Sequence, residues 1–222
     1  MERLCSVWLY LAGIAIAASV PASAEVVNFD DLNGSAGDVI LDSISPYHGF
    51  TWTNVSVYTS TPGFPGFNNG IVSPPNAAFT AGDNFGSPIV SSITAASPFN
   101  FISGYFGSGW YDGLNVTVDG LDKGTQEFSK TITVDTEGAQ LFTFDFTAIT
   151  ELDIFSTVTA ATTDPYGCGP SGCSQITLDD LTFTPASGPP PPVPEPGTLP
   201  FVALGALALA ASRRLFTSAR KS

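Results

Sequence analysis

The segment Leu114-Asn115-Val116-Thr117-Val118-Asp119 alternates apolar and polar side chains without interruption. Successive side chains of a β-strand point to opposite faces, so this period of two predicts a strand with one buried face. The segment Phe142-Thr143-Phe144-Asp145-Phe146-Thr147 repeats the pattern. No part of the chain between residues 25 and 184 carries a convincing helical period. We therefore predict an all-β domain over residues 25–184.

Other short segments rich in Val, Ile, Phe and Thr are separated by Gly, Pro and Asn, and these are also predicted as strands. They are residues 26–29, 49–58 with a turn near Asn54, 71–73, 77–80, 89–94, 99–106, 128–134, 152–156 and 176–183. Many short strands joined by turns are typical of a two-sheet β-sandwich. Residues 62–69, with the sequence Pro-Gly-Phe-Pro-Gly-Phe-Asn-Asn, are predicted as a loop.

The last predicted strand changes phase at Asp179-Asp180. Ile176 and Leu178 belong to one face, whereas Leu181 and Phe183 are one residue out of that register. A shift of this kind predicts a β-bulge at the aspartate pair.

The charge of the chain is strongly acidic. Of its 20 acidic residues all but Glu2 lie between residues 25 and 196, against only Lys123 and Lys130, so this part has a formal charge of 2 − 19 = −17. Such a charge repels phosphate backbones, which excludes nucleic acid as a natural partner.

The first 24 residues have the pattern of a secretory signal peptide. Arg3 precedes an apolar run over residues 7–20, and Ala22-Ser23-Ala24 stands just before Glu25. A positive start, a short apolar core and a small-x-small site predict export and cleavage after Ala24.

The chain ends in a spacer and a short apolar segment. Residues 185–196 contain seven prolines in twelve positions, so residues 185–198 are predicted as an extended linker. The apolar run 199–211 has 13 residues and is followed by Arg213-Arg214 in a basic tail that reaches residue 222. As a helix it would span about 20 Å, less than the hydrocarbon core of about 30 Å. This favours a transient inner-membrane anchor with its arginines on the cytoplasmic side.

Pro194-Glu195-Pro196, the short hydrophobic helix and the arginine pair together resemble the PEP-CTERM sorting signal of Gram-negative bacteria. The resemblance covers only the tail, and residues 215–222 extend beyond the arginines, where many such tails end. It implies processing by an exosortase-type enzyme and export to the cell surface or beyond, alongside exopolysaccharide or biofilm material. A plain single-span anchor and a buried terminal helix are the alternatives.

Phe29-Asp30-Asp31-Leu32 and Leu178-Asp179-Asp180-Leu181 resemble, more loosely, the terminal strands of galactose-binding-like jelly rolls, including carbohydrate-binding modules. The resemblance implies a jelly-roll sandwich in which the first and last strands lie side by side. Asp30, Asp31, Asp179 and Asp180 would then gather, and calcium is the ion that suits four carboxylates without histidine or free thiol. Solvated surface acids are the alternative.

The richest aromatic stretch covers residues 101–113. Tyr111 and Asp112, at a turn flanked by glycine, are predicted as exposed sugar contacts, whereas Trp110 is predicted in the core. The alternative is that all the aromatic residues here fill the core.

Cys168 and Cys173 are the only cysteines of the predicted mature chain. Export to an oxidising compartment predicts a disulfide between them, which would hold the loop before the last strand.

Residues suited to catalysis are few. His48 is the only histidine, and neither a Gly-x-Ser-x-Gly motif nor a zinc-type cluster accompanies it. We predict a non-catalytic cell-surface or matrix protein that binds exopolysaccharide. A structural matrix or coat component without a specific ligand, and a glycosidase that uses two carboxylates, are the alternatives.

Overall fold

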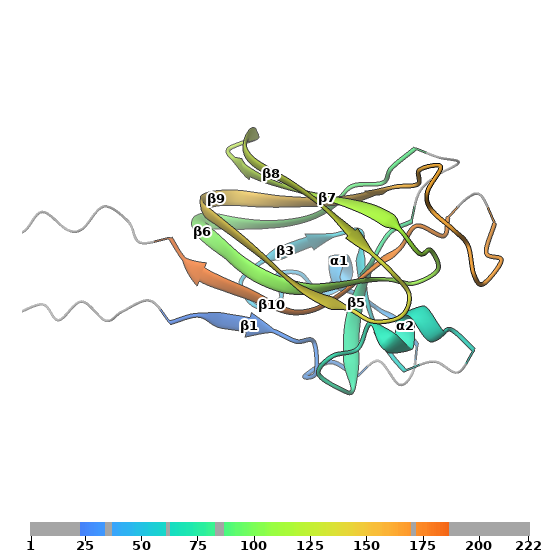
Figure 1. The fold of residues 1–222 in the computed structure, drawn as a ribbon. Helices are drawn as coiled ribbons and strands as arrows, with labels where there is room; N and C mark the ends of the chain where they lie inside the picture. Colours follow the sequence, from blue (N-terminus) through green and yellow to red (C-terminus); the bar gives the residue numbers. More distant parts are fainter. Residues whose placement is uncertain (1–22, 34–36, 61–62, 83–86, 170–171, 187–222) are drawn as a thin grey trace, which may run out of the picture. The chain divides into compact units, whose positions relative to one another are not determined.

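The computed structural model describes residues 23–33, 37–60, 63–82, 87–169 and 172–186 (Figure 1). These residues all belong to one compact unit, Met1–Ala186. The predicted sorting motif, the hydrophobic helix and nearly all of the signal peptide and linker lie outside the described residues.

The described chain is built almost entirely of strands. They are β1 (Glu25–Val27), β2 (Val39–Ile40), β3 (Thr51–Thr53), β4 (Val55–Thr59), β5 (Asn76–Thr80), β6 (Ser91–Ser108), β7 (Leu114–Asp122), β8 (Thr125–Val134), β9 (Gln140–Thr157) and β10 (Ile176–Pro185). Two short helices are α1 (Leu41–Ile44) and α2 (Pro65–Asn69). All strand pairings are antiparallel, in the order β2-β4-β5-β10-β6-β9-β7-β8, with β1 beside β10 and β3 beside β6. The all-β prediction is confirmed.

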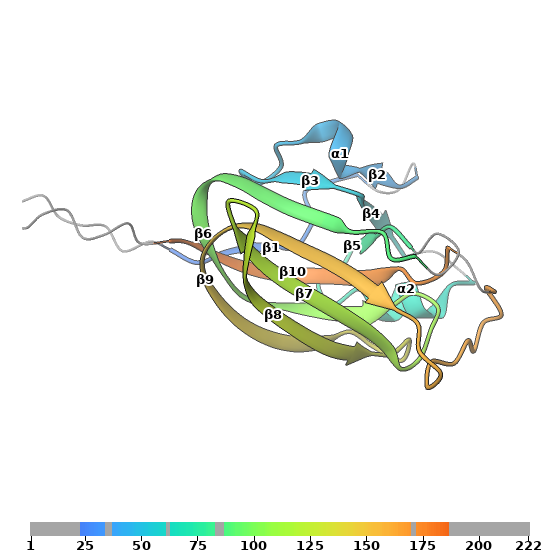
Figure 2. The same ribbon diagram turned by 90° about the horizontal axis from the view of Figure 1, so that it is seen from above.

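Two long strands fold this sheet into two layers. β6 and β9 have 18 residues each and pair with each other along a register that shifts between Thr94 and Ser103. Their curvature is visible in Figures 1 and 2. In one layer the β6–β9 pair is extended by β10 and β5. In the other layer it is extended by β3, β7 and β8. The result is the predicted jelly-roll sandwich.

The core lies between the two layers. The alternating residues Leu114, Val116 and Val118 are fully buried, and Phe144 and Phe146 are nearly so. Alternation therefore identified the buried face of β7 and of the first half of β9.

The first and last strands are neighbours, as expected for a jelly roll. Glu25 pairs with Phe183 and Val27 pairs with Leu181. The predicted bulge is present as well, because the register of β10 against β6 shifts between Asp179 and Thr182, and Asp180 has a φ of 48°.

Three local expectations are wrong. Residues 71–73 form no strand, because the N–H groups of Val72 and Ser73 donate to the Asp179 carboxylate, at 2.7 and 2.8 Å, and not to a neighbouring strand. Strands predicted as separate are joined: residues 91–94 and 99–106 are parts of β6, and residues 142–147 and 152–156 are parts of β9. The stretch 62–69 contains α2, which begins at Pro65, where the missing N–H is not needed.

Candidate functional site

An aromatic cavity of about 260 Å³ lies among α2, β4, β5 and the turn after β6. Five aromatic side chains line it: Tyr58, Phe64, Phe67, Phe79 and Trp110. The other lining residues are Asp38 and Gln175. We call this site the Trp110 cavity.

Helix α2 supplies one wall of the Trp110 cavity. Phe64 and Phe67 are three residues apart and both pack edge-on against Trp110, with ring centroids 5.2 and 5.8 Å away. The helix lies so close to the turn that a Cβ on Gly66 would come within 2.2 Å of the carbonyl oxygen of Gly109. Glycine at position 66 therefore permits the contact that forms this wall.

The floor of the cavity comes from β4 and β5. The Tyr58 hydroxyl donates to the carbonyl of Phe67 at 2.6 Å, which ties the floor to α2. Phe79 packs against both Tyr58 and Phe67, at 5.8 and 5.7 Å between ring centroids. Burial, and secondarily the negative charge of Asp179, raise the pKa of Tyr58 far above its usual value, so the hydroxyl stays protonated.

Asp38 and Gln175 give the cavity two acceptor groups, a carboxylate and a side-chain amide oxygen. Asp38 is exposed at the rim. The Oε1 atom of Gln175 is buried and accepts no hydrogen bond from the part of the chain that the structure describes. No Lys, Arg or His is among the described residues that line the cavity. An apolar aromatic surface with a few polar groups is a common form of small-ligand site.

The predicted contact residues Tyr111 and Asp112 have structural roles. Tyr111 is only 5% exposed, its hydroxyl donates to the carbonyl of Gly169, and its N–H donates to Ser108. Asp112 accepts the N–H of Thr136 at 2.9 Å. The expectation that Tyr111 is exposed is wrong. Its neighbour Trp110, expected in the core, is half-buried and lines the cavity.

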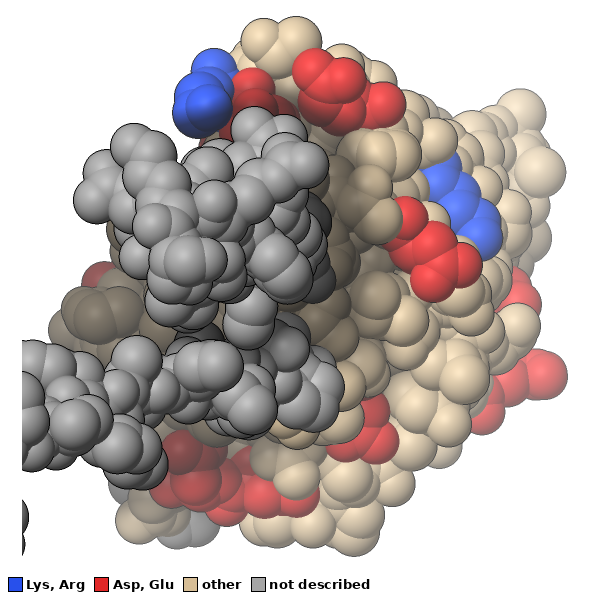
Figure 3. Space-filling model, turned by 90° about the vertical axis from the view of Figure 1, so that its left-hand side faces the viewer, with Lys and Arg blue, Asp and Glu red and all other residues tan. Residues whose placement is uncertain are grey.

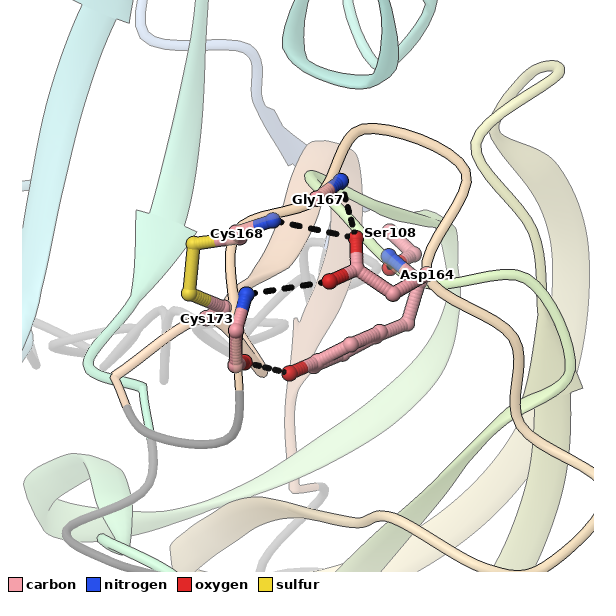
Figure 4. The surroundings of a disulfide bond; sticks show 7 residues. Ser108, Asp164, Gly167, Cys168 and Cys173 are labelled. Atoms are coloured by element: carbon pink, nitrogen blue, oxygen red, sulfur yellow. Dashed lines mark hydrogen bonds between the residues drawn. A yellow bond between two sulfur atoms is a disulfide. The ribbon is translucent and has the colours of Figure 1, made fainter.

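The disulfide between Cys168 and Cys173 is present (Figure 4). The loop that carries it wraps around Asp164, whose carboxylate accepts the N–H groups of Gly167, Cys168 and Gly169 at 2.8, 3.2 and 3.0 Å. These hydrogen bonds, that from Gly169 most strongly, lower the pKa of Asp164. The bond from Tyr111 to Gly169 attaches this loop to the turn that holds Trp110.

The four aspartates proposed as calcium ligands each have protein partners. Asp30 accepts the N–H of Asn76 at 3.1 Å, and Asp31 accepts the hydroxyl of Tyr47 at 2.6 Å. Asp179 is fully buried under Val72 and Ser73, and Asp180 accepts the Ser73 hydroxyl at 3.0 Å. Within the described ranges no three His, Cys, Asp or Glu side chains come together as a metal site requires. Calcium binding at these residues stays a prediction.

His48 lies beside two carboxylates at the edge where β1 begins. Its Nδ1 is 2.7 Å from Glu25 Oε1, and its Nε2 is 3.6 Å from Asp31 Oδ2. A second, smaller cavity of about 170 Å³ lies here, lined largely by apolar residues such as Phe50, Phe99 and Phe183. Among the described residues, the two ring nitrogens of His48 contact the carboxylates of Glu25 and Asp31 and no hydroxyl or thiol nucleophile, so this group does not have the arrangement of a catalytic triad.

Sequence reasoning missed most of the Trp110 cavity. Its lining from Asp38, Tyr58, Phe79 and Gln175 comes from separate parts of the chain that only the fold brings together. One local signal was present: Phe64 and Phe67 stand three residues apart in a stretch otherwise composed of turn residues. Aromatic residues in a loop do not belong to the core face of a strand, which makes them candidates for a binding site.

Comparison with known proteins identifies the tail. Residues 192–214 match the model of the PEP-CTERM protein-sorting motif, which confirms the sequence-based identification. The chain therefore carries the sorting signal of an exported protein. In the described part of the chain no helix is long and apolar enough to cross a membrane. No curated protein matches the sequence.

Several solved structures resemble the domain at low identity. TmCBM61, solved in complex with β-1,4-galactotriose, is 10% identical with a TM-score of 0.36, over 65% of this chain and 93% of that one. The family 29 carbohydrate-binding module CBM29_1 from Piromyces equi is 11% identical with a TM-score of 0.41, over 75% and 93%. The CBM22 tandem domain from Paenibacillus barcinonensis Xyn10C is 12% identical with a TM-score of 0.42, over 82% and 50%. At these scores none of the three says what this chain binds.

Proposed function

We propose that this exported protein is a non-catalytic glycan-binding domain and that the Trp110 cavity holds a sugar unit of an extracellular polysaccharide. The observation that carries the proposal is the cavity itself, in which five aromatic side chains from four separate segments meet beside two hydrogen-bond acceptors. A sugar ring presents apolar C–H faces and polar hydroxyl edges. Aromatic rings suit the faces, and Asp38 and Gln175 suit the hydroxyl donors.

The cavity favours binding over hydrolysis. A glycosidase of the usual kind places two carboxyl groups on either side of the bond that it cleaves. Asp38 is the one carboxylate among the described residues that line this cavity. Release of labelled sugar from a polysaccharide that the domain binds would contradict this point.

Replacing Trp110 by Ala should weaken glycan binding at least about tenfold, because a central aromatic contact usually dominates a small binding site. The measurement is a glycan array followed by calorimetry on residues 25–186, a segment that contains the whole core from Val27 to Phe183. Phe128→Ala is the matched control, since Phe128, in β8, is also half-buried but stacks on Phe146 of β9 and does not line the cavity. Phe128→Ala should leave affinity unchanged.

Unchanged affinity of Trp110→Ala would place binding elsewhere on the domain. An array without any bound glycan would favour the alternative of a structural matrix component that has no specific ligand.

We also propose that the tail is removed after export, because the apolar run of 13 residues is short for a permanent span. Intact-mass measurement on protein recovered from cells should find a chain that begins at Glu25 and lacks residues 199–222. A mature pool that still carries residues 199–222 would mean a plain membrane anchor.

A further inference from the structure

We infer that the Trp110 cavity prefers sugar units that carry a free, protonated amine over N-acetylated and carboxylated sugars. This inference rests on the proposed function and names the chemical class of its ligand. Three features of the cavity lead to it: its acceptors, its aromatic rings and the charge of its surroundings.

The acceptor atoms of the cavity favour a ligand that donates hydrogen bonds. The buried Oε1 of Gln175 lacks a hydrogen-bond partner among the described residues, and an unsatisfied buried acceptor is unfavourable until a ligand supplies an N–H or O–H. Asp38 adds a carboxylate, which accepts charge-assisted hydrogen bonds. A protonated amine brings three N–H donors and a positive charge, and therefore suits both groups.

The aromatic rings favour the same charge. Trp110, Phe64 and Phe67 meet edge to face, so ring faces and edges surround one small space. The face of an aromatic ring is electronegative, and cations bind over it, most strongly over Trp. A carboxylate next to several aromatic rings is a combination that recognises organic cations.

The surroundings oppose an anionic ligand. No Lys, Arg or His lines the cavity within the described ranges, and residues 25–196 have a formal charge of −17. The same sign of charge extends to the other end of the domain, where β1 begins and β10 ends: acidic side chains are scattered there and Lys and Arg side chains are few (Figure 3). A field of this sign attracts cationic chains and repels those with uronate or sulfate groups.

The test compares oligosaccharides of equal length built from glucosamine, N-acetylglucosamine and galacturonate, titrated into residues 25–186 at low salt. We expect the glucosamine oligomer to bind about tenfold more tightly than the N-acetylated one, and the galacturonate oligomer not to bind. Raising the pH from 6 to 9 removes the proton from the amine and should abolish the difference.

Asp38→Asn should reduce affinity for the glucosamine oligomer about threefold and leave affinity for the N-acetylated one unchanged. Asp145→Asn is the matched control, because it removes one exposed carboxylate that does not line the cavity. It should leave both affinities unchanged.

The outcomes separate the two claims. Equal binding of the glucosamine and N-acetylglucosamine oligomers, lost in Trp110→Ala, would overturn the amine preference and leave the glycan-binding proposal intact. Equal weakening by Asp38→Asn and Asp145→Asn would mean that only the overall charge matters, which also overturns it. Binding by none of the oligomers, nor by any glycan on the array, would overturn the proposed function itself.

Discussion

Gly66→Ala should destabilise the domain by about 2–3 kcal/mol and abolish glycan binding at the Trp110 cavity. A Cβ at this position would lie 2.2 Å from the Gly109 carbonyl oxygen and 2.6 Å from that of Ser108. Both are backbone atoms, so the clash can be relieved only by moving α2 away from the turn. Such a movement would separate Phe64 and Phe67 from Trp110. Alanine is otherwise the better helix former, and the destabilisation therefore reports the lack of space.

The measurements are urea unfolding and the calorimetric titration on the same protein. Gly138→Ala is the matched control, because a Cβ on Gly138 would meet nothing within 4 Å. It should leave both stability and affinity unchanged. A Gly66→Ala protein of unchanged stability that still binds would mean that the position of α2 does not define the cavity.

The second large effect is a dependence of folding stability on pH, and it is due to Asp179. Burial raises the pKa of this carboxyl from its ordinary value of 3.8 to about 6. The hydrogen bonds from Ser73 and Val72 lower the pKa, and the negative charge of Asp180 raises it, but burial has the largest effect. The folded state therefore holds a proton on Asp179 more tightly than the unfolded state does. Protonation stabilises the fold as pH falls through about 6, and the gain is complete below 3.8.

Asp179→Asn isolates this contribution, since an uncharged amide oxygen can still accept the N–H groups of Val72 and Ser73. Relative to the variant, the natural protein should gain about 3 kcal/mol of stability between pH 7 and pH 3.5. The measurement is the difference in the free energy of unfolding, because other carboxylates change the stability of both proteins alike. Asp145→Asn, which removes an exposed carboxylate, is the control for the loss of one negative charge. If the difference in unfolding free energy between the natural protein and Asp179→Asn did not change with pH, the raised pKa of the buried Asp179 carboxyl would be contradicted.

Local patterns predicted the parts of the fold that depend on alternation. Leu114, Val116 and Val118 face the core as their spacing requires, and the phase shift at Asp179 marks a real bulge. The neighbouring terminal strands followed from the jelly-roll resemblance and are present as Val27 opposite Leu181. The buried faces and the bulge can be read from sequence because the side-chain period of a strand is a local property.

The remaining features depend on contacts between distant residues. The sequence predicts separate strands over 89–94 and 99–106, yet Pro98, between them, lies inside β6 where its register against β9 shifts and a ladder hydrogen bond is dispensable. Residues 71–73 have the composition of a strand, but Asp179, more than 100 positions later, accepts the N–H groups of Val72 and Ser73. Trp110 and Tyr111 are adjacent, and which of them faces inward is decided by α2 on one side and the Gly169 carbonyl on the other.

The place of β10 in the sheet has a consequence for biogenesis. This strand is the last of the domain in sequence, yet it lies between β5 and β6 and also pairs with β1. A nascent chain that ends before Ile176 lacks the strand that joins these segments, so the sandwich closes only when residues 176–185 arrive. Pairings between such distant segments form slowly. We therefore expect the emerging polypeptide to remain unfolded, and thus able to thread through a secretion channel, until its whole length has been made.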